Sequence, residues 1–125
     1  RTLDWLQASY DIGYQVITME EYNKLGHEKC SKMILDKLGD NPIYVTFDLD
    51  CLDPAVAPGV ANIESAFRGF NMDEVRKLLQ SLKGRNVIGG DVACLMPTKD
   101  SPNNITSMVA AAVMFEIICL ISINL

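Results

Sequence analysis

The sequence predicts an α/β domain with three layers, α-β-α, around a mainly parallel sheet. Apolar runs rich in β-branched residues alternate with longer stretches of helical periodicity, an order typical of right-handed βαβ units. Acidic residues follow one of the apolar runs, as expected when ligands bind beyond the carboxyl ends of parallel strands. No repeat or linker composition divides residues 1–125, so we interpret the chain as part of one domain.

The first half of the chain predicts a strand, a helix and a second strand. Residues 14–18 and residues 43–50 are apolar and β-branched enough for the two strands. Between them, residues 19–38 predict one continuous helix. The residues expected on its inner face are Tyr22, Leu25, Cys30, Met33 and Ile34.

The second half predicts a helix, a strand and a helix. The helix over residues 71–82 begins at Asn71, and Glu74 three residues later predicts a capping box. Gly84 suits the end of this helix, and a strand follows over residues 86–95. The residues expected to be buried by the helix are Met72, Val75, Leu78, Leu79 and Leu82.

The final predicted helix, residues 104–123, is long and apolar enough to cross a bilayer. We expect it to pack in the core of a soluble domain instead. The alanines at 110–112 allow close packing on a sheet, and the charge of Glu116 would be costly at the centre of a membrane. We therefore predict no membrane partner.

Three carboxylates, those of Asp48, Asp50 and Asp53, gather where the second predicted strand ends. Alternate residues of a strand share a face, so Asp48 and Asp50 are expected on one side with Cα atoms about 6.6 Å apart. Two hard oxygen donors there suit divalent cations. A solvated acidic turn is the alternative. Asp53, before Pro54, is interpreted as an Asx turn that shapes the loop.

The stretch FDLDCLDPAVAPG at residues 47–59 resembles the signature of the ureohydrolases, the family of arginases and agmatinases. Residues 12–21 resemble the family strand before that signature and residues 87–97 the one after it. The likeness covers about residues 10–120, and agmatinase-like members are the most similar. It implies an arginase-like fold, of which residues 1–125 would be the C-terminal part, because family domains are much longer.

The resemblance also implies a reaction, the hydrolysis of a guanidino compound to urea and an amine. The family uses two Mn²⁺ ions, and ions about 3.5 to 4 Å apart can activate a water molecule. By position, Asp48 would bridge both ions and Asp50 would bind one. The other ligands belong to upstream segments. His27 fits none of those patterns and is expected to be an exposed helix residue, so we expect this chain alone to be inactive.

The chain departs from the family pattern in two places. After Gly59, residues 60–63 lack the two threonines, the glycine and the proline that the family has there. The family also has a glutamate that grips the substrate guanidinium. Aligned through Asp91 and Pro97, that position holds Cys94. A neutral thiol cannot form a bidentate charge-assisted pair, and losing such a partner costs about 2 to 5 kcal/mol.

Three functions therefore stay open. The chain belongs to a metal-dependent ureohydrolase, to a noncatalytic relative that keeps the fold and assembles with an active partner, or to a structural domain that binds one Ca²⁺ or Mg²⁺. The first would take a small guanidino substrate. By analogy with the family, we expect a homotrimer or homohexamer.

Charge and cysteine usage exclude other classes. A net charge of −5 without a Lys/Arg stripe argues against a nucleic-acid partner. The cysteines, Cys30, Cys51, Cys94 and Cys119, form no C-x-x-C pair, which argues against a structural zinc site or a redox dithiol. Reduced thiols are typical of a cytoplasmic or organellar compartment, where we place the protein.

Overall fold

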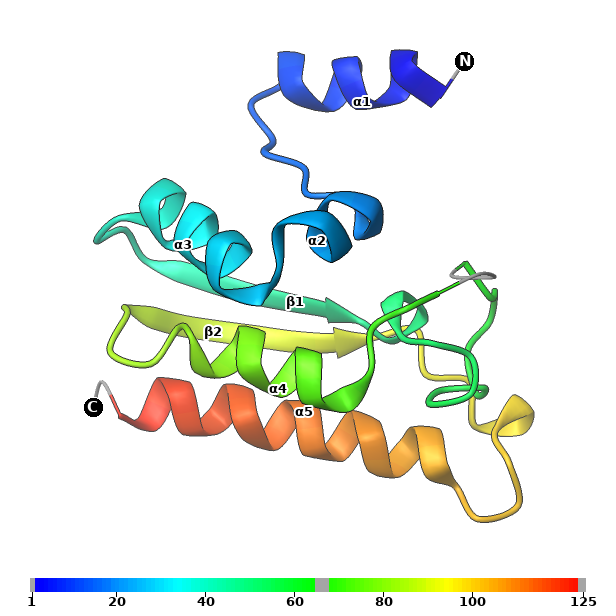
Figure 1. Ribbon diagram of the computed structural model, residues 1–125. Coiled ribbons are helices and arrows are strands. Elements are labelled where there is room, and N and C mark those ends of the chain that lie inside the picture. Colours follow the sequence, from blue (N-terminus) through cyan, green and yellow to red (C-terminus); the bar gives the residue numbers. More distant parts are fainter. Residues whose placement is uncertain (1, 65–67, 124–125) are drawn as a thin grey trace.

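A computed structural model describes residues 2–64 and 68–123 of the chain, without the side chains of residues 2–5. The elements in chain order are α1 (Thr2–Asp11), α2 (Met19–Leu25), α3 (His27–Leu38), β1 (Ile43–Asp48), η1 (Leu49–Cys51), α4 (Met72–Gln80), β2 (Val87–Ala93), η2 (Pro97–Lys99) and α5 (Ile105–Ser122). Strands β1 and β2 are parallel, and Figure 1 shows α4 and α5 running along them. The predicted parallel sheet with helices, as part of an α/β domain, is confirmed.

One face of the sheet carries the core. In β1 the odd-numbered residues point inward, beginning with buried Ile43, while the even-numbered ones are exposed. Helix α5 lies against β2 so closely that a Cβ on Gly90 would be 2.7 Å from the Cγ2 of Ile117. Residues of α4, β2 and α5 contribute most of the cluster: Val75, Leu79, Val87, Val109, Val113, Ile117 and Leu120.

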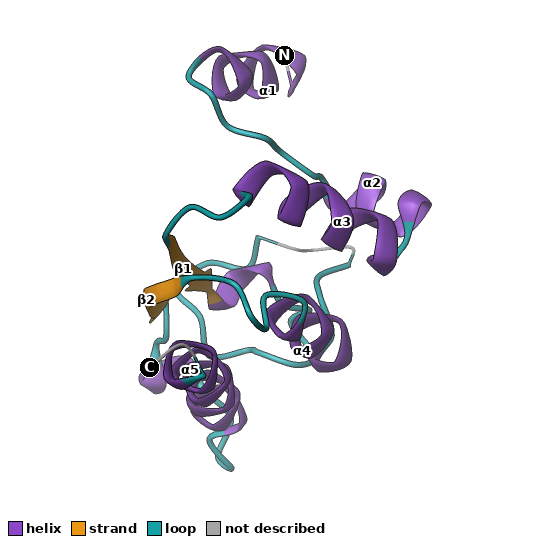
Figure 2. Ribbon diagram, turned by 90° about the vertical axis from the view of Figure 1, so that its left-hand side faces the viewer, coloured by secondary structure: helices purple, strands orange, loops and turns teal. Residues whose placement is uncertain are grey.

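The opposite face of the sheet is open. Tyr44 and Ile88 are each 61% exposed there. The hydroxyls of Tyr44 and Thr46 both donate to the carboxylate of Asp91, at 3.0 and 2.8 Å. Figure 2 shows the helices to one side of the strands, so the second helical layer of the predicted three-layer fold does not come from the residues described.

The N-terminal predictions need correction. Residues 14–18 form no strand, because a strand requires a hydrogen-bonded neighbour and the described part of the chain supplies none beside them. They connect α1, a helix that we did not predict, to α2, and Figure 1 shows this part held away from the sheet. The predicted helix over residues 19–38 is two helices, because Gly26 has a φ of 82° and interrupts the helical backbone.

The later helices agree better with the sequence. Helix α4 has the predicted capping box, in which the Asn71 side chain accepts from the Glu74 N–H at 3.0 Å and the Glu74 carboxylate accepts from the Asn71 N–H at 3.0 Å. Helix α5 is long and apolar enough to cross a membrane, with a mean hydropathy of 2.2. One side of it packs on the sheet, while Met108 and Phe115 on the other side are each 65% exposed.

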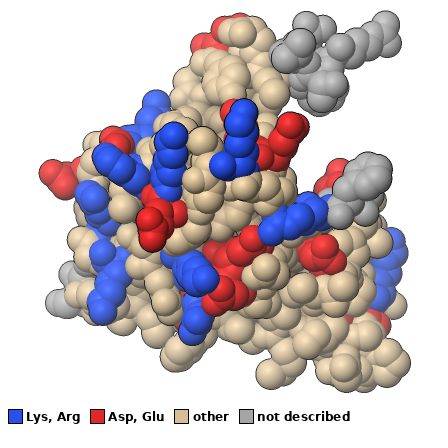
Figure 3. Space-filling model, viewed as in Figure 1, with Lys and Arg blue, Asp and Glu red and all other residues tan. Residues whose placement is uncertain are grey.

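Charges are mixed over the face that Figure 3 presents, where Lys and Arg lie among Asp and Glu. Several pair within one helix turn, such as Lys77 and Asp73 on α4, whose Nζ and Oδ2 atoms are 2.5 Å apart. Exposed pairs of this kind contribute about 0.2–1 kcal/mol each. The pairs on α4 therefore add little to stability, and most of the stability of the fold comes from the apolar core.

Candidate metal centre

Strand β1 ends at Asp48 because its own side chain starts a turn. The Asp48 Oδ1 accepts a hydrogen bond from the Asp50 N–H at 3.3 Å, capping the 3₁₀ helix η1. Leu49, fully buried in the core, anchors this turn. Asp50 therefore lies on η1, and the expectation that Asp48 and Asp50 alternate along one strand is wrong. The turn nevertheless keeps both carboxylates at the same end of the sheet.

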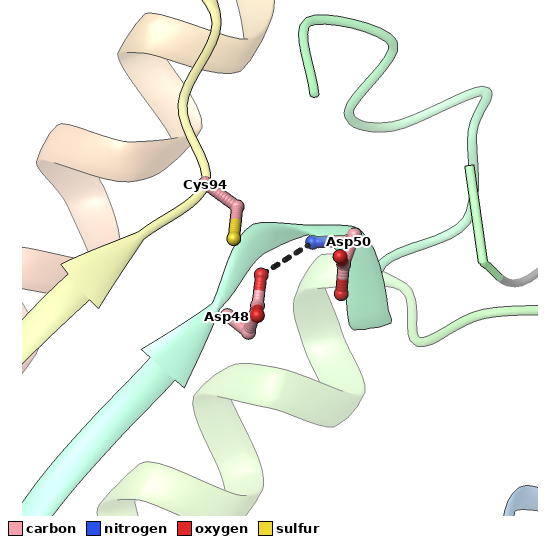
Figure 4. A group of neighbouring side chains, drawn as sticks. All are labelled: Asp48, Asp50 and Cys94. Atoms are coloured by element: carbon pink, nitrogen blue, oxygen red, sulfur yellow. Dashed lines mark hydrogen bonds between the residues drawn. The ribbon is translucent and has the colours of Figure 1, made fainter. Parts of the chain in front are cut away.

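Cys94 brings a thiol to the same place from the neighbouring strand. Asp48 pairs with Ala93 in the parallel register, so Cys94 follows directly after the residue beside Asp48. Its backbone is left-handed, with a φ of 68°. Figure 4 shows the sulfur directed at the Asp48 side chain. One donor atom from each of Asp48, Asp50 and Cys94 lies within 4.8 Å of the others.

Burial and nearby negative charge raise the pKa values of Asp50, Cys94 and Cys51 at this end of the sheet. Burial raises the pKa of Asp50, and the charge of Asp48 adds to that effect. A hydrogen bond to Asp48 raises the pKa of the Cys94 thiol to about 11. Burial and then the two aspartates raise the pKa of Cys51 to about 12. The folded chain thus crowds anionic groups together, a situation that a bound cation would relieve.

The loop after η1 is fixed by hydrogen bonds. The Asp53 Oδ1 accepts from the Ala55 N–H at 2.9 Å, which is an Asx turn. Farther along, the Gly59 carbonyl accepts from the Met96 N–H at 2.8 Å, and Val60 forms an isolated bridge with Leu95. The loop therefore folds back on the segment that follows β2. Both strand ends that carry the cluster are tied to each other.

Asp100 secures the same region from the start of α5. Although desolvation raises the pKa of Asp100, hydrogen bonds from Ser107 and Thr106 outweigh it and hold that pKa well below its ordinary value. Its Oδ1 accepts from the N–H groups of Ser101 and Thr106, and its Oδ2 accepts from the N–H and hydroxyl of Ser107. The carboxylate thereby satisfies free N–H groups at a helix N-terminus.

Other predicted or overlooked residues take different places. His27 starts α3 and is not a plain exposed residue, since it is half-buried, its Nδ1 is buried without a hydrogen-bond partner and its Nε2 lies 3.4 Å from the Ser31 Oγ. Glu64, which we did not single out, is near enough that its charge helps to raise the pKa of Asp50. The sequence could have pointed to Glu64 through its position in the loop that follows residues 47–59.

A groove of about 390 Å³ lies elsewhere, between α4 and α5.

The chemistry of the cluster suits one divalent cation in part. Two carboxylates and a thiol from adjacent strand ends can supply three donors to one ion, but the usual coordination of Mn²⁺ needs more oxygen or nitrogen donors than these. A pair of ions would need further ligands. The described residues could therefore supply the two carboxylate ligands of the two-ion site that the resemblance implies, but not the full set of ligands.

Comparisons with known proteins identify the family of the chain. The model of the Arginase family matches residues 2–120. A guanidinopropionase from Pseudomonas aeruginosa is 37% identical over 112 residues, which are 90% of this chain and 34% of that protein. Putative agmatinase 3 from Schizosaccharomyces pombe is 35% identical over 108 residues, 86% of this chain and 26% of that one.

A solved structure is similar over nearly the whole chain. The proclavaminate amidino hydrolase from Streptomyces clavuligerus superposes with a TM-score of 0.86 at 32% identity, covering 93% of this chain and 38% of that one. The chain thus spans between about a quarter and two fifths of the length of these relatives. The predicted arginase-like fold is confirmed for that part.

Proposed function

The chain belongs to the arginase family, and from that premise we propose that it supplies part of the active site of an enzyme that hydrolyses a linear guanidino compound to urea and an amine. The observation that carries the proposal is the pairing of Asp48 and Asp50 at the carboxyl end of a parallel strand. The names of the relatives support the substrate class, since they include a guanidinopropionase and an amidino hydrolase.

The chemistry explains why carboxylates are needed. A guanidinium group is cationic, resonance-stabilised and a poor electrophile, so it reacts with hydroxide and not with water. A pair of Mn²⁺ ions, when bound, would lower the pKa of a shared water toward neutrality. In our proposal Asp48 and Asp50 would hold the ions through their carboxylates, and further ligands would come from segments outside this chain.

A noncatalytic role is the second candidate, and Cys94 favours it. This residue stands where the family resemblance places a glutamate that grips the guanidinium, and a thiol offers no such pair. The chain would then keep the fold and assemble with an active subunit. Three predictions remain part of the proposal: a homotrimer or homohexamer, a cytoplasmic or organellar compartment, and no nucleic-acid or membrane partner.

Metal binding and urea release together test the proposal. In a complete polypeptide that contains this chain, Asp48→Asn should abolish both tightly held manganese and urea release from agmatine or guanidinopropionate, while Asp36→Asn, on the outer face of α3, should leave both unchanged. The isolated chain should release no urea. Full turnover by the Asp48→Asn protein would refute the proposal, and manganese retained without any turnover in the parent protein would favour the noncatalytic alternative.

A further inference from the structure

We propose that the Sγ of Cys94 is a third donor to the cation held by Asp48 and Asp50, so that this site selects a thiophilic divalent ion, Zn²⁺, over Mn²⁺. The inference rests on the proposed function, because it assumes that the two aspartates hold a metal ion. It adds a ligand that the ureohydrolase signature does not contain. It also changes which ion the site would prefer.

The geometry places the sulfur where a ligand is needed. The Cys94 Sγ and an oxygen from each aspartate all lie within 4.8 Å of one another. Around a tetrahedral zinc ion with bonds of roughly 2.0–2.3 Å, neighbouring donor atoms are about 3.5 Å apart. Asp48 and Cys94 are exposed side chains, so small rotations can bring the three atoms to that spacing.

The donors come from separate elements, which favours one defined arrangement. Asp48 ends β1, Asp50 belongs to η1, and Cys94 follows β2. The parallel register fixes Ala93 beside Asp48, and the hydrogen bond from the Met96 N–H to the Gly59 carbonyl joins the segment after β2 to the loop after β1. Cys94 is thus presented to the aspartates by backbone that is held on both sides.

The identity of the donor decides the ion. Carboxylates alone suit Mg²⁺, Ca²⁺ and Mn²⁺, whereas a thiolate favours Zn²⁺ and other softer ions. Tetrahedral zinc sites accept mixtures of sulfur and oxygen ligands and leave a position for water when the protein supplies three. Two oxygens and one sulfur meet that description. The other cysteine nearby, Cys51, is half-buried within η1 and offers a matched comparison.

Cobalt serves as the probe because Co²⁺ replaces Zn²⁺ and gives a near-ultraviolet charge-transfer band only when a thiolate is bound. The purified 125-residue chain, kept reduced, is titrated with Co²⁺ and then in competition with Zn²⁺ and Mn²⁺. We expect the band to appear, and we expect Zn²⁺ to bind at least about tenfold more tightly than Mn²⁺.

Variants assign the band to one sulfur. Cys94→Ser should remove the band and weaken Zn²⁺ binding by about tenfold or more while changing Mn²⁺ binding little. Cys94→Gly, which also relieves the left-handed backbone, should do the same in a chain that folds at least as well. Cys51→Ser and Cys119→Ser should keep the band, and circular dichroism checks the fold of each variant.

Three outcomes overturn the inference in different ways. If Co²⁺ binds without the band, or if Cys94→Ser leaves Zn²⁺ affinity unchanged while Asp48→Asn abolishes it, Cys94 is not a ligand but the aspartate site stands. If Asp48→Asn leaves all metal binding unchanged, both this inference and the proposed role of Asp48 in metal binding fail. If no ion binds the 125-residue chain saturably, this inference fails, while the two-ion site stands or falls with the manganese and urea measurements on the complete polypeptide.

Discussion

The buried hydroxyl of Thr106, at the start of α5, accepts a hydrogen bond of 2.8 Å from the backbone N–H of Gly59 in the loop after β1. The two residues are 47 positions apart in sequence. Gly59 is confined further, because a Cβ there would lie 2.8 Å from the Cβ of Asp100. The loop that follows the acidic cluster is thus fastened to the helix that packs on β2.

Replacing Thr106 with Val should destabilise the chain by about 1–3 kcal/mol, because the shape is kept while a buried N–H loses its acceptor. Thr106→Ser keeps the hydroxyl and should cost less. Urea denaturation followed by circular dichroism measures both. A Thr106→Val chain as stable as the parent would mean that the Gly59 N–H finds another partner.

Asp100 predicts a dependence of stability on pH. Its pKa is held below the ordinary value by hydrogen bonds from Ser107 and Thr106, which outweigh the effect of desolvation. A depressed pKa means that the carboxylate stabilises the fold above its unfolded pKa, and that this contribution is lost as the pH falls toward the folded pKa. Asp100→Asn should therefore be less stable at neutral pH, with the difference shrinking in acid.

Denaturation of the two proteins between neutral pH and about pH 3 tests this, since an ordinary aspartate titrates near pH 4. Asp11→Asn, on the exposed end of α1, is the control for loss of one charge. A stability difference that stays constant across this range, or grows as the pH falls, would contradict the assignment of the depressed pKa to Asp100.

Local signals in the sequence predicted the parts of the fold that depend on near neighbours. The capping box of Asn71 and Glu74 fixed the start of α4, because both partners lie within one helical turn. The apolar, β-branched composition of residues 43–50 predicted β1. Residues 14–18 have a similar composition but no strand to pair with, and pairing is a property of the whole chain.

The sequence pointed to the residues of the candidate site but predicted their geometry less well. Asp48 and Asp50 were expected at a strand end, but counting alternate residues missed that the Asp48 side chain caps a 3₁₀ turn. Cys94 was placed from the family pattern, and the parallel register brings it beside Asp48. The bond between Gly59 and Thr106 joins residues remote in sequence, and no local pattern announces such a contact.

Gly69 should tolerate no side chain. A Cβ there would lie 2.3 Å from the backbone of Leu52 and Asp53, where Phe70 and Leu52 form a bridge. Gly69→Ala should therefore destabilise the fold by about 1–3 kcal/mol or more, because backbone atoms cannot move aside as side chains do. The added methyl group is expected to displace the backbone of Leu52 and Asp53, shortly after Asp50.

Gly84→Ala is the matched control, since Gly84 has open space around it but a φ of 79°. It should cost only about 1–2 kcal/mol for the left-handed backbone. Thermal unfolding ranks the two variants, and Zn²⁺ or Mn²⁺ titration reports on the site. If Gly69→Ala unfolds at the same temperature as the parent, the close approach between these segments does not exist in solution.

The acidic cluster predicts opposite effects of one substitution on stability and on binding. Burial, and secondly the charge of Asp48, raise the pKa of Asp50. The fold therefore favours the protonated Asp50 carboxyl and loses stability as the pH rises through that raised pKa. Asp48→Asn keeps an oxygen that can accept from the Asp50 N–H and removes the repulsion. Without metal, this variant should be more stable at neutral pH by about 0.5–1 kcal/mol.

Calorimetry with and without metal measures both effects. Saturating Zn²⁺ or Mn²⁺ should raise the unfolding temperature of the parent chain but not that of Asp48→Asn, because a ligand stabilises the form that binds it. Asp36→Asn matches the change in net charge and should respond to metal as the parent does. If Asp48→Asn were less stable than the parent without metal, the carboxylates at the end of β1 would be balanced by the folded chain itself, and no cation would be needed to hold them together.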